Sequence, residues 1–525
     1  MLKLQPESLD WALEHAIKQG DTDIFPRAFE FHAIKYKWDE IKSYLLQENI
    51  LEWRARPCRR CLAPKHRYGF RVSTQLDPLD FLIYTALVYE IGSDLEDKRI
   101  PIDSQCVFSY RFAPSSEGIL FDNNMDYGAF QSKSRELLDT GKYSHVVTAD
   151  IADFYPRLYI HRLQNAMQRC TKRNNHVKAI MNLLNQWNEH FSYGIPVGPA
   201  PSRLLAEIAI DDVDRVLLSE GSTFVRFIDD FRIFCTSLVD AYEKLALLAT
   251  TLFENHGLGL QQHKTKIFTS DDFQKTRFLS HEATELERLT KRFYEIAIGL
   301  GLEDLYGYID YDALEPEQQA AIDSLNLEEL LAEQLQLEDI DIPLTRFILR
   351  RLGQLDSSDS IDEIFRAIDR LYPVAVDVAQ YLMKLRSLGT KNKQALGARI
   401  LELLRGTAVS RLEFHRMWFL ALFSSSNDWG NKDKLTGLFN NLGDAFSQRK
   451  IVLALGYCLE DHWFRMRKRS VFNFAPWLRR AFLAAASCLP GDEKRHWYQS
   501  LETRLDPLER AISVWARSKS SISQM

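Results

Sequence analysis

The sequence predicts an α+β protein whose first half mixes strands with helices and whose second half is helical only. Two β-prone runs, residues 145–150 and 224–234, alternate with helical patterns in the first half. From Pro343 onward the apolar residues recur at the helical period. No apolar stretch is long enough to cross a membrane, and the N-terminus lacks a signal-peptide pattern, so we expect a cytoplasmic protein.

Composition points to a globular protein of several domains with reduced cysteines. The chain has 525 residues, 46% of them hydrophobic and 26% charged, which suits two or three domains. Its seven cysteines are scattered. Cys58 and Cys61 with His66 are compatible with zinc, but no second ligand pair with metal spacing follows, so we do not predict a zinc site.

Charge and periodicity divide the chain into four predicted parts. Residues 1–50 form a helical segment, residues 51–285 a mixed domain, residues 286–345 an acidic linker and residues 346–525 a helical domain. The linker lacks Lys and Arg from Phe293 to Thr345, and residues 303–341 carry thirteen Asp and Glu. An acidic mimic of nucleic acid is the alternative interpretation of this segment.

The helical domain reads as a series of paired helices. One helical pattern covers residues 361–371, Pro373 breaks it, and a second covers residues 374–385. Further helices are expected at residues 398–404, 412–423, 434–446, 451–459 and 477–488. Paired helices with short polar breaks favour an α-solenoid of HEAT-like units, although no fixed repeat period is evident.

Two adjacent carboxylates, Asp229 and Asp230, are the most informative feature of the mixed domain. Apolar residues flank them on both sides, as expected for a strand, a tight turn and a returning strand. Two neighbouring acids at the tip of a hairpin repel each other unless a cation lies between them, and hard oxygen ligands suit Mg²⁺. A solvated surface pair is the alternative interpretation.

A second carboxylate position, Asp150, ends the β-prone run 145–150. A two-metal phosphoryl-transfer site needs carboxylates from separate strands to meet at ions roughly 3.5–4 Å apart, and Asp150 with Asp229 would supply them. Between them, the glycine- and proline-rich loop 193–201 allows a close approach of backbone to ligand, and we expect Ser202 to cap a helix over residues 204–218. Lys264 brings a cation within reach of a triphosphate.

Basic residues gather in two runs despite the net charge of −6. Seven Arg and Lys lie between Trp53 and Gln75, six lie between Tyr155 and Trp187, and neither run contains an acid. Solvated faces would explain such runs, but both flank the motifs predicted to handle phosphate. We therefore predict a channel for nucleic acid.

The order of these motifs resembles the palm of reverse transcriptases over about residues 55–285. Asp150 with an aromatic five residues later resembles motif A, residues 194–202 motif B, residues 227–230 motif C and residues 258–266 motif D. Residues 275–280 are similar to the primer grip, and residues 63–71 to the fingers motif that clamps phosphates. The resemblance implies a DNA polymerase using two Mg²⁺ ions, with Mn²⁺ as the alternative ion.

The resemblance also implies a role for each matching residue. Asp150, Asp229, Asp230 and Lys264 match catalytic positions, and Asp150, Ile151 and Asp229 match metal-binding positions. Lys65, Arg71, Tyr155 and Gly198 match positions that bind the dNTP, with Tyr155 excluding a 2′-OH. Phe227, Ile228 and Val197 depart from the usual tyrosine, small residue and glutamine, which changes contacts to the primer end and the nascent base pair.

A basic cluster in the helical domain interleaves cations with aromatic residues. The cations are Arg465, Arg467, Lys468 and Arg469, and the aromatic residues are Trp463, Phe464, Phe472, Phe474 and Trp477. Stacking on single-stranded bases would explain the pattern, and so would burial between helices. The two differ in the exposure of the rings, because a stacking platform requires exposed rings.

A reverse-transcriptase palm joined to an all-helical repeat domain resembles the abortive-infection (Abi) polymerases and other defence-associated reverse transcriptases. That resemblance implies an α+β fold with fingers and palm followed by an all-α HEAT-like domain. It further implies a homo-oligomer active in anti-phage defence, which makes single-stranded DNA from dNTPs without a template and attached to a protein hydroxyl. The sequence leaves open whether the protein binds an associated RNA. The alternative functions are a retron- or group II intron-like templated enzyme and an inactive nucleic-acid-binding scaffold.

Overall fold

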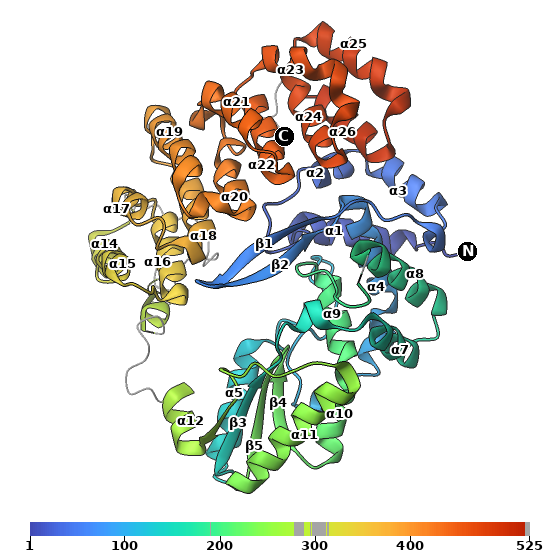
Figure 1. Ribbon diagram of the computed structural model, residues 1–525, viewed down its shortest axis with the longest axis vertical. Coiled ribbons are helices and arrows are strands. Elements are labelled where there is room, and N and C mark those ends of the chain that lie inside the picture. The colour runs from blue at the N-terminus through green and yellow to red at the C-terminus, as the bar shows by residue number, and fades with distance from the viewer. Residues whose placement is uncertain (190, 278–287, 294–295, 297–310, 312–313, 520–525) are drawn as a thin grey trace. The chain divides into compact units, whose positions relative to one another are not determined.

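The computed structural model describes residues 1–189, 191–277, 288–293, 296, 311 and 314–519 (Figure 1). The chain divides into two compact units. The first comprises Met1–Arg60 with Ser73–His281, and the second comprises Cys61–Val72 with Glu282–Met525.

A four-stranded antiparallel sheet is the centre of the first unit. Its strands are β3 (His145–Asp150), β4 (Thr223–Phe227), β5 (Asp230–Cys235) and β6 (Lys266–Thr269), in the order β4-β5-β3-β6. Consecutive residues of β3 and of β5 are buried, so each strand contributes buried side chains to both faces of the sheet. The β-prone runs of the sequence therefore form the two central strands and their neighbour.

Helices cover both faces of this sheet. On one face, α5 (Tyr127–Asp139) and α12 (Ser270–Arg277) close a core that includes Phe130, Phe273, Val146 and Phe234. On the other face, α11 (Leu238–His256) packs on β3 and β5 and is flanked by α10 (Asp211–Ser219). Ser237 caps α11 and Gly257 ends it in the left-handed conformation.

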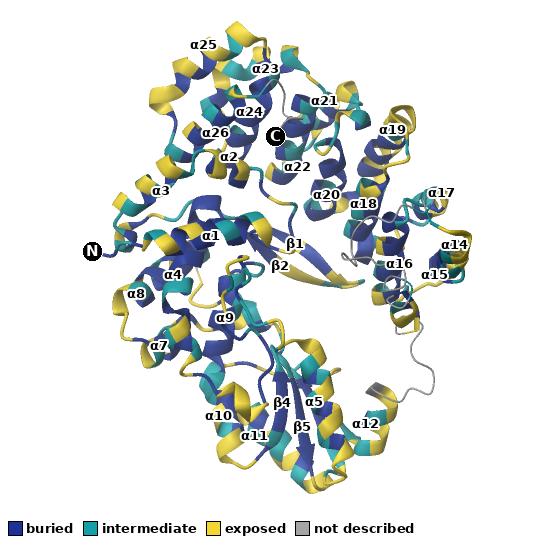
Figure 2. Cartoon of the chain, turned by 180° about the vertical axis from the view of Figure 1, so that it is seen from behind, coloured by how far each residue is buried: buried dark blue, intermediate teal, exposed yellow. Residues whose placement is uncertain are grey.

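A second layer of helices surrounds α4 (Pro78–Glu96), which is buried along most of its length (Figure 2). It contacts α1 (Pro6–Lys18), α7 (Ile160–Cys170), α8 (Asn174–Asn188) and α9 (Ala200–Ala209). Two further N-terminal helices, α2 (Glu30–Tyr36) and α3 (Trp38–Gln47), pack against α1. The N-terminal helical segment thus shares one compact unit with the palm.

The expected helix over residues 204–218 and its serine cap are both wrong. The chain forms α9 and α10 with a break at Ile210, and α9 begins at Ala200 after Pro199, with no side-chain cap. Ser202 is buried, and its hydroxyl lies 3.1 Å from the Tyr84 hydroxyl. Proline at the start of α9 fixes the helical geometry without a capping side chain.

The second unit is mostly helical. Its hairpin segment belongs to β1 (Arg59–His66) and β2 (Gly69–Gln75), which pair as a two-stranded sheet. Residues 288–293 are helical as well. The α-helices of this unit whose bounds the structure describes are α14 (Pro316–Asp323) and α15 (Leu327–Gln336), which lie in the acidic segment, and then α16 (Ile342–Gln354), α17 (Ile361–Arg366), α18 (Ala375–Lys384), α19 (Thr390–Gly406), α20 (Glu413–Phe423), α21 (Lys432–Asn441), α22 (Ala445–Tyr457), α23 (Asp461–Arg467), α24 (Pro476–Ala485), α25 (Gly491–Leu501) and α26 (Pro507–Arg517).

The even-numbered helices from α16 to α26 form one stack. α16 packs on α18, and the series continues through α20, α22 and α24 to α26. These helices are largely buried, whereas α19 and α25 expose more of their surface (Figure 2). The predicted helix over residues 434–446 is two helices, because α21 ends at Asn441 and α22 starts at Ala445 behind its cap Asp444.

An arginine near the start of one stacked helix repeatedly bonds the start of the next. Arg346 contacts Asp377 at 3.1 Å, Arg416 contacts Asp444 at 2.9 Å, and Arg479 contacts Glu509 at 2.6 Å. Arg449 donates to the Trp477 carbonyl at 2.8 Å. Each contact places a cation at a helix N-terminus together with an acid or carbonyl, which fixes the offset between neighbours.

The predicted α+β class and the mostly helical C-terminal region are confirmed. Among the helices of the described ranges, none combines the length and apolar character needed to span a membrane. Part of the acidic segment lies outside the described residues.

Candidate active site

The two adjacent aspartates lie where the sequence predicts a hairpin turn. β4 and β5 pair up to Phe227 opposite Asp230, which leaves Ile228 and Asp229 as the turn. Ile228 has φ +60°, a left-handed conformation that is rare for a β-branched residue. Strain of this kind persists only where the surroundings impose it, and such positions concentrate at functional sites.

Asp150 meets this turn across the sheet. The register of β3 with β5 sets Asp150 opposite Asp230. The Ile151 N–H donates to the Asp229 carbonyl at 3.0 Å, just beyond the last pair of the ladder. The three acids therefore gather at one end of adjacent strands, as the two-metal hypothesis requires.

Lys264 completes the group. Its Nζ lies 2.7 Å from Asp150 Oδ2, and its side chain is 45% exposed. The segment that carries it is anchored at Asp150 as well, because the Gln261 N–H donates to the Asp150 carbonyl at 2.8 Å. A half-exposed cation thus lies next to a carboxylate that is only 13% exposed.

The donor set fits a hard divalent cation. Asp150, Asp229 and Asp230 bring carboxylate oxygens to the same end of β3 and β5, and the Lys264 ammonium bonds Asp150. No group of three or more His, Cys, Asp and Glu side chains with metal-binding geometry occurs among the residues that the structure describes. Mg²⁺ held by these carboxylates would take water and substrate phosphates as further ligands.

A buried ionic network beneath the turn was not predicted. Arg226 donates to the Ile228 carbonyl at 2.8 Å and forms a two-pronged ion pair with Asp214. Ser109 accepts from the Ile228 N–H at 2.9 Å and donates to Glu207 at 2.7 Å. The backbone of Ile228 is therefore held on both sides, which explains how the strained turn is maintained.

Glu207 joins the parts of this network. It accepts from Arg99 at 2.9 Å and lies 3.0 Å from Arg226, and all three side chains are almost fully buried. Burial opposes the charge of Arg226, but Asp214 and Glu207 outweigh it and raise the pKa of Arg226. A buried charge network in which every member is bonded is rigid. Loss of one partner leaves an unpaired buried charge, whose desolvation costs several kcal/mol of stability.

The loop of motif B is held by two other segments. The Thr74 N–H of β2 donates to the Val197 carbonyl at 3.1 Å. Gly198 has φ +131°, and a Cβ at this position would lie 2.6 Å from Thr22 Oγ1. Glycine is therefore required here both by conformation and by the close approach of the N-terminal segment.

Tyr155 lies on the short helix α6 (Phe154–Arg157) and is half-buried. Its carbonyl accepts from the Ile195 N–H at 3.1 Å, which ties motif A to the motif B loop. Burial raises its pKa well above the usual range, and the nearby Tyr110 and Asp229 act in the same direction. The phenol therefore stays protonated.

Arg203 is a second residue that sequence reasoning missed. It lies in α9, its guanidinium sits 5.4 Å from the Tyr110 ring centre, and it pairs with Asp23 at 3.0 Å. The only sequence signal was its place directly after Ser202 in the motif B segment.

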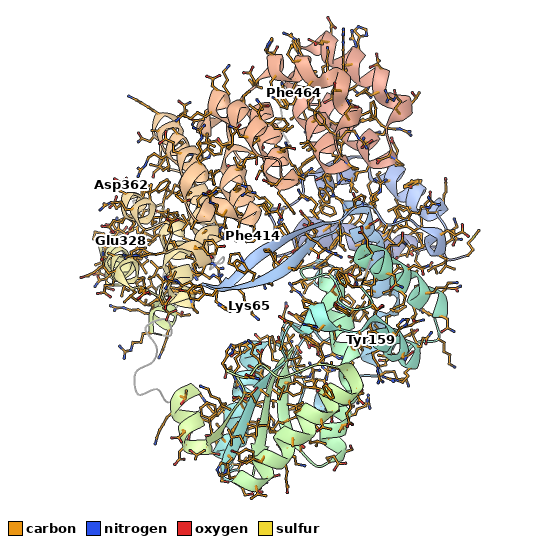
Figure 3. The ribbon with its side chains drawn as sticks, viewed as in Figure 1. Lys65, Tyr159, Glu328, Asp362, Phe414 and Phe464 are labelled. Atoms are coloured by element: carbon orange, nitrogen blue, oxygen red, sulfur yellow. The ribbon has the colours of Figure 1, made fainter. Side chains whose placement is uncertain are left out.

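The predicted triphosphate ligands Lys65 and Arg71 lie in the second unit. Lys65 is an exposed residue of β1, as Figure 3 shows, and Arg71 is an exposed residue of β2. Between them, Arg67 forms an ion pair with Asp339 and donates to the Glu338 carbonyl at 3.0 Å. The hairpin predicted for the fingers is present, and its basic tip contacts the acidic segment of the same unit.

The basic cluster of the helical domain is partly neutralised within that domain. Glu493 pairs with Arg465 at 2.8 Å and also with Lys468. Arg467 lies over the Trp463 ring at 4.3 Å, and Arg469 is exposed. The rings of Trp463, Phe464 and Trp477 are buried, so they pack between helices (Figure 3 labels Phe464).

The residues similar to the primer grip end α12. Residues 275–277 close this helix, and residues 278–280 lie outside the described residues.

Comparison with known proteins identifies the central part of the chain. Residues 105–286 match the family model "Reverse transcriptase (RNA-dependent DNA polymerase)". These residues, which hold Asp150, Asp229, Asp230 and Lys264, are a reverse transcriptase domain, and the protein is accordingly a nucleotidyltransferase.

A solved structure of telomerase from Candida albicans in complex with a TWJ fragment of telomeric RNA is among the similar structures. It is 13% identical, the match covers 72% of this chain and 69% of that chain, and the TM-score is 0.33. No curated protein matches the chain.

Proposed function

We propose that the protein is a DNA polymerase of the reverse transcriptase type in which Asp150, Asp229 and Asp230 bind two Mg²⁺ ions, with Mn²⁺ as the alternative. The observation that carries this proposal is the meeting of Asp150 with the Asp229–Asp230 turn at one end of β3 and β5. The metal ions would supply the charge stabilisation for in-line attack on the α-phosphate of a dNTP.

The surrounding residues have separate roles in this proposal. Lys264, next to Asp150, stabilises or protonates the leaving pyrophosphate. Tyr155 blocks a ribose 2′-OH, and Gly198 lets the loop approach the nucleotide. Lys65 and Arg71 hold the triphosphate.

The finer proposal is that synthesis is template-independent, begins on a protein hydroxyl and serves anti-phage defence, as in the Abi-type enzymes that the sequence resembles. Two contacts support a departure from ordinary template use. Thr22 lies against Gly198, and Val197, which replaces the usual glutamine, is tied by its carbonyl to β2. The N-terminal segment therefore occupies the surface beside the motif B loop.

A templated reverse transcriptase is the second candidate. The description of the matching family as an RNA-dependent DNA polymerase favours it. In either case the single-stranded DNA product, an associated RNA and assembly into a homo-oligomer in the cytoplasm are proposals.

The helical unit is proposed to be a HEAT-like repeat domain over residues 346–525, with residues 1–50, 51–285 and 286–345 as the other parts of the chain. The repeated arginine contacts between successive stacked helices support this proposal. Regular offsets between helix pairs are what a solenoid requires.

The test of the catalytic assignment is nucleotide incorporation by charge-neutral variants. Asp229→Asn and Asp150→Asn should each lower incorporation about a thousandfold or more, because metal-assisted stabilisation is worth several kcal/mol in the transition state. Asp139→Asn, an exposed acid at the end of α5, is the matched control and should retain activity. Wild-type rates in Asp150→Asn or Asp229→Asn would overturn the assignment.

A further inference from the structure

A cavity of about 240 Å³ lies beside the motif B loop in the first unit. The N-terminal segment forms one wall, and the loop with the start of α9 forms another. Residues that line it include Asp21, Thr22, Asp23, Phe121, Gly198 and Arg203. The cavity therefore combines polar side chains with the phenyl ring of Phe121 next to a predicted nucleotide-binding loop.

A chain of ring contacts connects the cavity to the catalytic turn. The ring centres of Phe121 and Tyr110 are 4.9 Å apart, and Tyr110 also lies under Arg203 at 5.4 Å. Tyr110 in turn lies 6.5 Å from the ring of Phe227, the last residue before the Ile228–Asp229 turn. The cavity is thus one aromatic residue away from the hairpin that carries the predicted metal ligands.

Asp21 is an incompletely bonded buried carboxylate at this cavity. Its Oδ2 accepts from Gln75 Nε2 at 2.9 Å, whereas its buried Oδ1 has no hydrogen-bond partner among the described residues. Burial raises the pKa of Asp21 to about 6, so the ionised acceptor dominates at pH 8. A buried polar atom without a partner is costly and points to a donor that the protein itself does not provide.

Charge restricts the group that could enter. Asp21 and Asp23 together outweigh Arg203, so the cavity disfavours a phosphate. Asp23 is 67% exposed, so its ion pair with Arg203 is weak and can be exchanged for another acceptor. An uncharged planar group with both donors and acceptors satisfies a carboxylate and a guanidinium together, and Phe121 offers a ring for stacking.

We propose that this cavity binds the base of the incoming nucleotide, with Asp21 accepting from an amino group and Arg203 donating to a carbonyl oxygen. Guanine and cytosine carry both groups, so the site favours them over adenine and thymine. The inference rests on the proposed polymerase activity and gives it a source of base selection that needs no template strand.

The experiment compares single-nucleotide incorporation at pH 8 for the four dNTPs. Wild type should prefer dGTP and dCTP, and Asp21→Asn or Arg203→Gln should change this preference by about tenfold, the order expected for one good contact to a base edge. Asp23→Asn, at an exposed position that does not endanger folding, should shift the preference in the same assay. An equal loss for all four dNTPs, or an unchanged preference in all three variants, would overturn the proposal.

A matched control and a binding measurement separate this proposal from the proposed activity. Asp80→Asn changes another buried aspartate of the same unit, which accepts from Trp53 and Trp187 and does not line the cavity, so it should leave the preference unchanged. Equilibrium dialysis with labelled dNTPs and Ca²⁺ requires no turnover. If wild type fails to polymerise without a template but still binds dGTP and dCTP more tightly than Asp21→Asn does, the activity proposal fails and the base site stands. Equal binding of all four dNTPs by wild type contradicts the base site.

Discussion

Tyr155 is placed so that its ring can act as a barrier to ribose. It is half-buried on α6, and its backbone is tied to the motif B loop through Ile195. We predict that Tyr155→Ala admits ribonucleotides and narrows the preference for dNTPs over rNTPs by at least about tenfold, because removal of the ring opens space for the 2′-OH. The preference is measured as the ratio of kcat/KM for each dNTP and its rNTP.

Tyr159→Ala is the control for this change. Tyr159, labelled in Figure 3, lies four residues further on, forms a β-bridge with Tyr193 and is 42% exposed. This variant should keep the preference for dNTPs. A Tyr155→Ala enzyme that polymerises with unchanged sugar selectivity would show that Tyr155 is a core residue only.

Ile228 illustrates how a single residue can depart from local preference at a functional site. Left-handed backbone costs a β-branched residue about 1–2 kcal/mol. Here Arg226 and Ser109 bond both polar atoms of its peptide, and Glu207 bonds Ser109. The stiff surroundings maintain the turn, so Asp229 and Asp230 are presented in a fixed geometry.

At the level of secondary-structure elements, contacts between helices stabilise the helical unit. Asp444 caps α22 by accepting from the Ser447 N–H at 2.8 Å and also pairs with Arg416 of α20. We predict that Asp444→Ala lowers the free energy of local opening at the start of α22 by about 1–3 kcal/mol, since a cap and a charge-assisted bond are both lost. Hydrogen exchange of the α22 amides measures this value.

Asp433→Ala provides the matched comparison, because Asp433 is an exposed acid in the first turn of α21. Its α22 amides should exchange at the wild-type rate. Unchanged protection in Asp444→Ala would mean that the contact between α20 and α22 contributes nothing to the stack.

The basic cluster around α23 tests whether the helical unit guides a nucleic acid. Joint replacement of Arg465, Arg467, Lys468 and Arg469 by glutamine should shorten products and reduce the salt dependence of DNA binding, because each phosphate contact adds to that slope. Glu493 already pairs with two of these cations, so we expect the decrease in the salt slope to correspond to the loss of fewer than four phosphate contacts. Product length and salt slope are the measurements.

Arg495→Gln is the control for the cluster, since Arg495 is an exposed cation of α25 paired with Asp492. It should leave both measurements unchanged. If the fourfold variant also matches wild type, the cluster is a solvated surface and its aromatic neighbours serve packing alone.

Across the whole molecule, the features that depend on local sequence pattern could be predicted from the sequence. Alternating apolar residues around Asp229 and Asp230 predicted the hairpin, and the strand ending at Asp150 predicted its partner. Helix starts were harder to predict, as Ser202 shows: Pro199 precedes α9 and Pro201 lies in its first turn, so the helix begins before Ser202, whose hydroxyl bonds Tyr84.

Long-range partners could not be predicted in this way. Glu207 and Ser109 are separated by 98 residues and meet only because α9 and the segment after α4 pack together beneath the turn. Thr22 against Gly198 depends likewise on the placement of the N-terminal segment. From the sequence alone, a charged residue such as Arg226 is expected to be exposed. The structure explains its burial, because Asp214 and Glu207 form ion pairs with it.

Template-independent synthesis on the protein itself is the central claim, and one measurement tests it most directly. Purified full-length protein is incubated with Mg²⁺ and labelled dNTPs alone, then separated on a denaturing gel with and without protease. We predict that the label migrates with the polypeptide and that protease releases it as DNA. Activity that appears only with an annealed RNA template and primer, and yields product free of protein, would contradict the account.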